Sequence, residues 1–247
     1  MSKGTLRQIL LITDGCSNQG EDPVAIAALA KEQGITVNVI GVVDDGEMSK
    51  RGIAEVEGIA MAGGGISQVV YARQLPQTVQ MVTRKAMTQT LYGVVHRELK
   101  QILGSEQELE DLPPDKRGQV MEVVDELGET VDLYIVVLVD TSASMKNKLP
   151  MVQEALIDLS ISLNSRMGGN LFCLYSFPGK RNEIERLIDW TPKFDSLTGI
   201  FHKLVSGGIT PTGPALKEAM KQFANVSGKR RWIGRGDDEE FFESTGM

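Results

Sequence analysis

The sequence is poor in the residues that build several common kinds of site. It has only two cysteines, Cys16 and Cys173, and two histidines, His96 and His202. Two cysteines without CxxC spacing support neither a disulfide framework nor a zinc site, and they favour a reducing, cytoplasmic setting. Two histidines offer little material for histidine-based catalysis or metal binding.

Long apolar runs and an excess of positive charge are missing too. The longest apolar runs, such as residues 133–139, are far shorter than a membrane-spanning helix. A short apolar run over residues 9–12 is soon followed by Asp14, so we expect no signal peptide. The 26 Lys and Arg against 33 Asp and Glu leave a net charge of −7. Nucleic acid and anionic membrane surfaces are therefore poor candidates for partners.

What remains is an ordinary globular composition, with 41% hydrophobic and 24% charged residues in 247. Strands and helices alternate in the first 72 residues, which predicts a parallel sheet. Asp22 is the expected N-cap of the first helix, with Pro23 at its first position. The strands are expected over residues 7–14, 35–43 and 66–72, and the helices over 22–33 and 49–62.

The rest of the chain divides into a helical stretch, a second α/β stretch and a charged tail. Two helices, over 75–103 and 116–127, are expected around an acidic loop at 106–115. From residue 227 the charges come in blocks, which predicts a disordered tail. Between them, strands are expected over residues 133–140, 171–177 and 184–190, and helices over 149–167, 194–204 and 214–223.

Polar residues follow the most apolar strand in the pattern DxSxS, formed by Asp140, Ser142 and Ser144. A carboxylate and two hydroxyls that converge at a strand end form a hard oxygen site, which suits Mg²⁺, Mn²⁺ or Ca²⁺ better than Zn²⁺. The alternative is that a serine only caps the next helix. Because the pattern is short, DxSxS alone favours the helix cap.

Two further elements strengthen the metal interpretation. Thr210 lies in a glycine-rich loop, GGxTxTG, before a helix, and Asp14 ends another buried strand in the sequence TDG. With DxSxS, these elements resemble the metal-ion-dependent adhesion site (MIDAS) of von Willebrand factor A (vWA) domains. The resemblance covers about residues 6–85 and 131–224. It implies that Asp140, Ser142, Ser144, Thr210 and Asp14 bind the metal.

The order of the elements differs from that of the family. In vWA domains the DxSxS strand comes first and the TDG strand lies in the middle, whereas here the TDG half is N-terminal. We therefore expect one circularly permuted vWA domain with a doubly wound, mostly parallel sheet flanked by helices. Its parts are the TDG half 1–85, a helical connector 86–130, the DxSxS half 131–226 and the tail 227–247. The sequence leaves open whether the protein is a monomer or a domain-swapped dimer.

The charges at such a site indicate what it does. Two carboxylates neutralise a divalent ion and hydroxyls add no charge, so a partner's Asp or Glu can complete the coordination. The expected function is Mg²⁺- or Mn²⁺-dependent binding of another protein, with Ca²⁺ as a further choice and no catalysis. The alternatives are a phosphoryl-transfer enzyme that uses Asp140 and a metal-free scaffold. The permuted order also resembles small vWA proteins of spore-forming bacilli, which implies a regulatory, sporulation-related setting.

Overall fold

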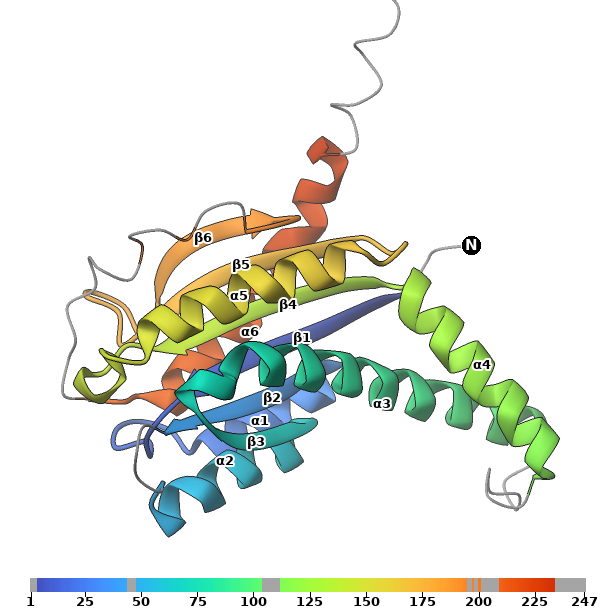
Figure 1. Ribbon diagram of the computed structural model, residues 1–247, viewed down its shortest axis with the longest axis horizontal. Helices are drawn as coiled ribbons and strands as arrows, with labels where there is room; N and C mark the ends of the chain where they lie inside the picture. The colour runs from blue at the N-terminus through green and yellow to red at the C-terminus, as the bar shows by residue number, and fades with distance from the viewer. Residues whose placement is uncertain are drawn as a thin grey trace, which may run out of the picture.

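Six strands form one sheet in the order β3-β2-β1-β4-β5-β6 (Figure 1). Strands β1 to β5 pair in parallel, and β6 runs antiparallel to β5. The strands span Thr5–Thr13 (β1), Ile35–Val43 (β2), Gly64–Tyr71 (β3), Asp132–Asp140 (β4), Asn170–Phe177 (β5) and Glu185–Thr191 (β6). This computed structural model describes residues 4–43, 48–103, 112–194, 197, 200 and 209–233.

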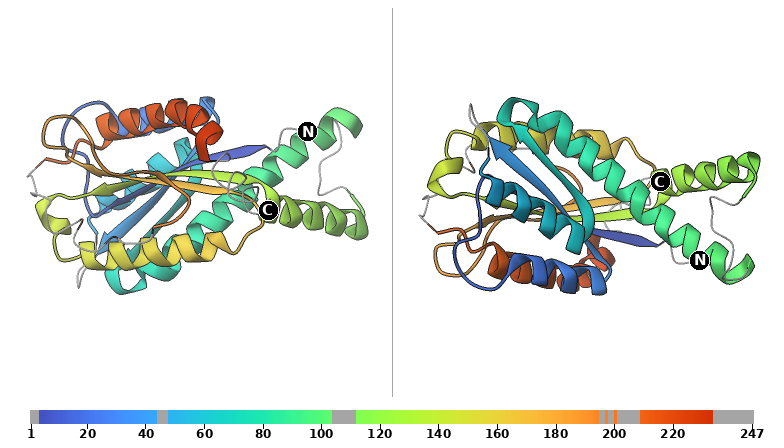
Figure 2. Two further views of the ribbon diagram at one scale, coloured as in Figure 1. Left: turned by 90° about the horizontal axis from the view of Figure 1, so that it is seen from above. Right: turned by 90° about the horizontal axis from the view of Figure 1, so that it is seen from below.

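Helices cover both faces of the sheet, as the doubly wound prediction requires (Figure 2). Helices α1, α2 and α6 contribute to the core on one face, and α3, α4 and α5 to the core on the other. The predicted α/β class with a mostly parallel, helix-flanked sheet is thus confirmed. The helices span Pro23–Glu32 (α1), Lys50–Ala62 (α2), Leu75–Leu103 (α3), Pro114–Thr130 (α4), Leu149–Asn164 (α5) and Thr212–Ile233 (α6).

The central strand β4 explains why the sheet needs both layers. Every one of its nine residues is buried. Alternate side chains enter opposite cores, with Val137 on the α3–α5 face and Leu138 on the α1–α6 face. Each fully buried aliphatic side chain stabilises the fold by about 1.5–3 kcal/mol, so a strand of this composition has to lie in the middle of the sheet.

Helix caps follow the predicted local chemistry. The Asp22 carboxylate accepts the Val24 backbone N–H at 3.0 Å, with Pro23 at the first helical position of α1. At the start of α2, the Ser49 hydroxyl accepts the Gly52 N–H at 3.1 Å. These caps fix the residues at which helices begin after the carboxyl ends of β1 and β2.

The expected boundaries agree with the observed ones within three residues for most elements, but α6 is longer. It was expected over 214–223 and runs to Ile233, so residues 227–233 are helical where a disordered tail was expected. Phe223 packs on Trp190 with ring centroids 5.8 Å apart, and Val226 is buried, so tertiary contacts carry the helix onward. Most of the helix expected over 194–204, the loop at 106–111 and the tail beyond 233 lie outside the described residues.

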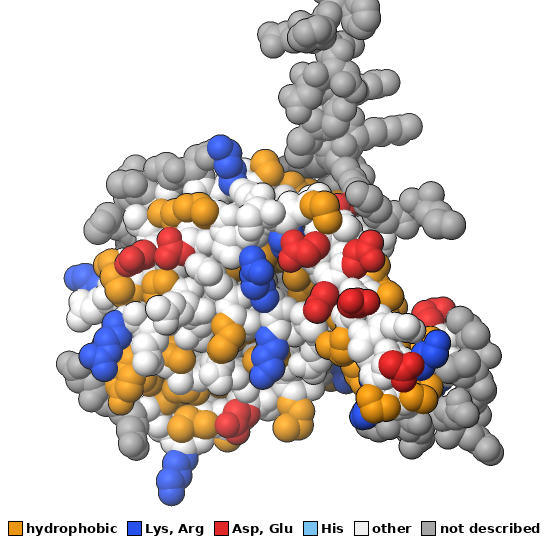
Figure 3. Space-filling model, turned by 45° about the vertical axis from the view of Figure 1, so that its right-hand side comes forward, with side chains coloured by type: hydrophobic (Ala, Val, Ile, Leu, Met, Phe, Trp, Pro, Cys, Tyr) orange, Lys and Arg blue, Asp and Glu red, His pale blue; other side chains and the backbone are white. Residues whose placement is uncertain are grey.

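The α3–α4 pair projects beyond the amino-terminal ends of β1 and β4 (Figure 1). The first half of α3 packs on the sheet through Val79 and Val82, while Leu91 and Gly128 bring the two helices together. The far side of the pair keeps apolar side chains exposed, and Figure 3 shows hydrophobic side chains beside acidic ones on this side of the molecule. The exposed apolar residues are Val94, Met121, Val123 and Leu127.

Arg166, just after α5, ties the end of α4 to the sheet. Its guanidinium donates to the Gly128 carbonyl at 2.8 Å, the Val131 carbonyl at 2.7 Å and Asn170 Oδ1 at 2.6 Å. Burial lowers the pKa of Arg166.

Across the described ranges, no helix is both long enough and apolar enough to cross a membrane.

Candidate functional site

The two strands that end in aspartate motifs are neighbours. β1 and β4 pair in parallel, with Ile12 opposite Val139, so their carboxyl ends meet at one edge of the sheet. The strand order also reverses here, because β2 and β3 lie beyond β1 and β5 and β6 lie beyond β4. In open α/β sheets this switch point is where ligands bind.

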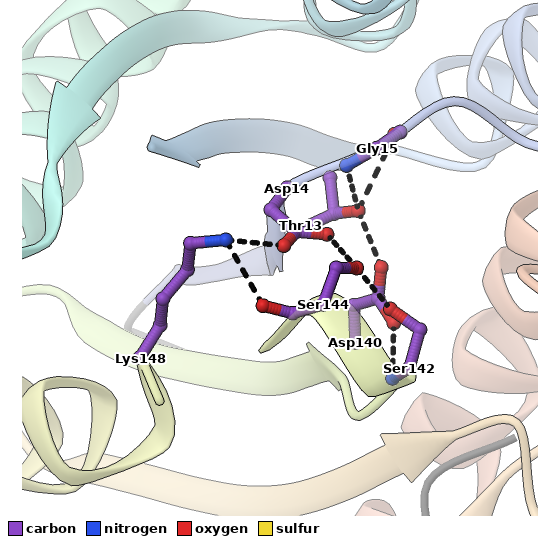
Figure 4. A network of polar contacts seen from close by, with 7 residues as sticks. All are labelled: Thr13, Asp14, Gly15, Asp140, Ser142, Ser144 and Lys148. Atoms are coloured by element: carbon purple, nitrogen blue, oxygen red, sulfur yellow. Dashed lines mark hydrogen bonds and ion pairs between the residues drawn. The ribbon is translucent and has the colours of Figure 1, made fainter. Parts of the chain in front are cut away.

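Four of the five predicted ligands form one network of polar contacts (Figure 4). Ser144 Oγ donates to Asp14 Oδ1 at 2.9 Å and lies 3.1 Å from Ser142 Oγ. The Ser142 backbone N–H donates to Asp140 Oδ1 at 2.8 Å. Residues about 130 positions apart in the sequence therefore build a single site.

The spacing of these oxygens fits a small divalent ion. Ligands about 2.1 Å from an octahedral Mg²⁺ have neighbouring oxygens about 3.0 Å apart. The gaps from Ser142 Oγ to Ser144 Oγ and from Ser144 Oγ to Asp14 Oδ1, 3.1 and 2.9 Å, equal one such edge each. Among the described residues no three His, Cys, Asp or Glu side chains gather into a metal-binding group. A metal here would thus depend on hydroxyl ligands.

Asp140 is the most buried carboxylate of the site, with 0% of the residue exposed. Burial raises the pKa of Asp140, while hydrogen bonds from the Ser142 backbone and the Thr13 hydroxyl act in the opposite direction. Thr13 Oγ1 donates to Asp140 Oδ2 at 2.8 Å. The threonine of the TDG sequence thus anchors the carboxylate of the neighbouring strand, a contribution that the motif did not predict.

Thr210 lies beside the network, held by the loop that follows β1. Its backbone N–H donates to Asn18 Oδ1 at 2.8 Å, and its carbonyl accepts from the Asn18 backbone N–H at 3.2 Å. Ser17 Oγ donates to the same carbonyl at 3.3 Å. The threonine loop is therefore joined to the Asp14 loop through the backbone atoms of Thr210, and the Thr210 side chain is not part of the network in Figure 4.

Lys148 is the second residue of the network, after Thr13, that sequence reasoning missed. Its ammonium donates to Asp14 Oδ2 at 2.5 Å and to the Ser144 carbonyl at 3.1 Å. Only 7% of the lysine side chain and 4% of the aspartate side chain are exposed. The one signal for it was a lysine shortly after DxSxS, just before Leu149 opens α5. Nothing in that spacing indicated that its side chain turns back to Asp14.

Comparison with known proteins places the chain in a family. No protein-family model matches it. Protein YabS of Bacillus subtilis (strain 168), itself described as uncharacterized, is 64% identical over 247 residues, which is all of both chains. This chain belongs to the YabS family. YabS comes from Bacillus subtilis, and the order of the two halves had already pointed to proteins of spore-forming bacilli.

A crystal structure supports the fold assignment for the YabS family. An uncharacterized protein from Alicyclobacillus acidocaldarius subsp. acidocaldarius DSM 446 is 42% identical and superposes with a TM-score of 0.83. The match covers 92% of this chain and 97% of the other. Neither relative brings a described activity, so the function has to be argued from the site itself.

Proposed function

We propose that this protein is a divalent-metal-dependent interaction module that binds a partner's carboxylate at a MIDAS-type site. In this proposal the domain is a circularly permuted vWA domain that works in a regulatory, sporulation-related setting in the cytoplasm. The metal, Mg²⁺ or Mn²⁺, would be held by Ser142, Ser144 and Thr210, and by Asp14 and Asp140 directly or through water. The metal supplies an electrophilic centre for the partner's Asp or Glu.

The observation that carries the proposal is the run of three oxygens from Ser142 through Ser144 to Asp14, separated by 3.1 and 2.9 Å. Two motifs far apart in sequence meet there because β1 and β4 are neighbours. Hydroxyls and carboxylates are ligands that Mg²⁺ and Mn²⁺ accept. The adjacency of the DxSxS and TDG strands is what the vWA arrangement requires.

Catalysis through Asp140 has less support. A phosphoryl-accepting carboxylate needs an oxygen that a substrate can approach. Asp140 is fully buried, and both of its oxygens accept hydrogen bonds, from Ser142 and Thr13. A metal-free scaffold has one observation in its favour, the ion pair between Lys148 and Asp14, which neutralises a charge that a metal would otherwise meet.

A calorimetric titration of Mn²⁺ and Mg²⁺ tests the proposal. We expect one ion per chain for the natural protein and a loss of at least tenfold in affinity for Asp14→Asn. Asp125→Asn, on the exposed face of α4, removes the same charge away from the site and should bind like the natural protein. An absence of binding up to about 10 mM metal in all three proteins, both without and with sodium acetate as a source of carboxylate, would contradict the proposal.

Recognition of a carboxylate needs a separate measurement. The metal-loaded protein should bind an immobilised peptide that contains Glu. Binding should disappear when Gln replaces Glu in the peptide or when EDTA removes the metal. The Glu-to-Gln pair keeps shape and removes charge, so it isolates the carboxylate. Equal binding of both peptides would show that the site does not read a carboxylate.

A further inference from the structure

We infer that Lys148 is a tethered cation that competes with the divalent ion for Asp14 and makes metal loading depend on a partner's carboxylate. This inference rests on the proposed function and adds a regulatory residue to the same site. It starts from an ion pair that the motif does not contain. The Lys148 ammonium holds one oxygen of Asp14, while the Ser144 hydroxyl holds the other.

The backbone fixes Lys148 in a position to do this. Its N–H donates to the Met145 carbonyl at 2.8 Å, and its own carbonyl accepts from the Val152 N–H at 3.1 Å in the first turn of α5. Met145 is fully buried and anchors the turn. The side chain then reaches back to Asp14 and the Ser144 carbonyl rather than into solvent.

The ammonium and a metal ion need the same carboxylate. A divalent ion bound to Asp14 would lie within a few ångströms of the ammonium, and two positive charges at that distance repel each other in a partly buried site. The metal therefore binds only when the ammonium withdraws or when another negative charge compensates. Lys148 thus lowers the affinity of the site for the metal alone.

Counting charges shows what restores the balance. Asp14, Asp140 and Lys148 together carry one negative charge, and a divalent ion changes this sum to one positive charge. A single carboxylate from a partner makes the loaded site neutral. Without Lys148, two carboxylates neutralise the ion by themselves, and the partner's charge is no longer needed. The lysine therefore couples metal binding to carboxylate binding.

The experiment is a calorimetric Mn²⁺ titration of the natural protein, Lys148→Met and two controls. We expect Lys148→Met to bind Mn²⁺ at least tenfold more tightly than the natural protein. Lys146→Met removes the same charge from an exposed position two residues earlier and should change the affinity less than twofold. Lys148→Arg keeps the charge and should bind within about threefold of the natural protein.

The coupling is measured by repeating the titrations in sodium chloride and in sodium acetate at equal ionic strength. Acetate should strengthen Mn²⁺ binding to the natural protein at least threefold more than to Lys148→Met. A purely structural role for Lys148 would not produce this difference. Should Lys148→Met fail to fold without metal, Lys148→Gln, which keeps a polar tip and removes the charge, replaces it, with the Mn²⁺-induced rise in Tm as the readout.

The outcomes separate this inference from the proposed function. If the natural protein binds Mn²⁺ and Lys148→Met binds it equally or more weakly, the inference is wrong and the proposed function stands. If only the neutral variant binds, the inference holds in its strongest form. If neither the natural protein nor Lys148→Met binds Mn²⁺, removing the competing ammonium does not produce a metal site. Both the inference and the proposed function are then overturned.

Discussion

At the scale of single residues, Asp140 is costly to bury, and the proposed metal would compensate its charge. Its carboxylate is fully buried, and burial raises its pKa, because a charge there loses its hydration. Only the hydrogen bonds from Thr13 and Ser142 offset this cost. A residue kept at such expense is typical of a site in which a ligand compensates the charge.

We therefore expect Asp140→Asn to separate metal binding from stability. Asn can still accept the Ser142 N–H, and its amide can donate to the Thr13 hydroxyl, so the free energy of unfolding without metal should stay within about 1 kcal/mol or rise. Mn²⁺ affinity should fall at least tenfold. Urea unfolding and calorimetry measure the two effects. Asp132→Asn, a buried aspartate at the other end of β4, is the control and should bind normally; equal losses in both variants would contradict this role.

Tyr175 gives the fold a defined sensitivity to alkaline pH. Burial raises its pKa from 10.0 to about 12, and its hydroxyl donates to Gln222 Oε1 of α6 at 2.9 Å. Below pH 10 both the folded and the unfolded chain keep this proton, so the shift contributes nothing. Between pH 10 and 12 only the unfolded chain loses it, and the free energy of unfolding should fall by about 2 kcal/mol.

Tyr175→Phe tests this expectation, because phenylalanine cannot titrate. At pH 8 the variant should be less stable than the natural protein by about 1 kcal/mol, for the lost hydrogen bond. By pH 12 the difference should shrink or reverse. Urea unfolding at both pH values measures it, and parallel pH curves for the two proteins would rule out the proposed effect.

The motifs predicted four residues of the network but not the two that support them. Asp14, Asp140, Ser142 and Ser144 could be assigned because each follows a buried strand, in motifs that resemble those of vWA domains. Thr13 and Lys148 contribute through side chains that cross to another segment, and such contacts depend on rotamers and on the turn at Met145. No pattern of residue types in the sequence specifies them.

At the scale of elements, two loops act as one support for the site. The loop after β1 and the loop before α6 exchange backbone and side-chain hydrogen bonds between Asn18 and Thr210. Close packing leaves no room for side chains there, since a Cβ on Gly213 would lie 1.9 Å from the Glu21 carbonyl oxygen. The glycine of the GGxTxTG loop thus allows α6 to start against the Asp14 loop.

We expect Asn18→Ala to loosen Thr210 without unfolding the protein. The Thr210 N–H loses the acceptor Oδ1 of Asn18, while the bond from the Asn18 backbone to the Thr210 carbonyl remains. Mn²⁺ affinity should fall about threefold to tenfold in calorimetry, with an unchanged circular dichroism spectrum. Gln19→Ala, at the exposed neighbouring position, should bind like the natural protein. An unchanged affinity for Asn18→Ala would mean that Thr210 makes no difference to the metal.

Most elements could be predicted because the signals were local. β4 is continuously apolar, and α1 begins with the N-cap Asp22 followed by Pro23. The end of α6 could not be predicted, because it depends on Trp190 and Phe223, which meet only in the folded molecule. Packing of the α3–α4 pair beyond the amino-terminal ends of β1 and β4 is likewise a property of tertiary structure.

At the scale of the whole molecule, the site needs β1 beside β4 but does not need either half to come first. The two strands pair along eight residues, from Thr5 opposite Asp132 to Ile12 opposite Val139. Sheet order is therefore independent of where the chain begins. The sequence predicted this adjacency through the resemblance to vWA domains, since no local pattern links the two motifs.

The α3–α4 connection should then be dispensable for the site. Arg7 of β1 and Phe223 of α6 line the same surface pocket. Because α6 continues to Ile233, a flexible linker of about twenty residues is used to join residue 233 to residue 4. A rearranged chain that runs from residue 112 to 233, then through the linker to residues 4–103, keeps every strand and every ligand. We expect it to be a monomer by light scattering, with Mn²⁺ affinity within about threefold of the natural protein.

Opening the chain at a different place provides the matched control. With the same linker, a chain opened between Gly20 and Glu21 cuts the support that holds Asp14 and Thr210 together, and Gly20 there has a φ of +89° and packs on Pro214. This chain should lose Mn²⁺ affinity at least tenfold, because entropy gained by the free loop ends opposes ordering of the ligands. If the first rearranged chain folds but binds no metal, the connector contributes to the site. If it forms dimers, the two halves pair between chains rather than within one, and the permuted single-domain arrangement gives way to a swapped one.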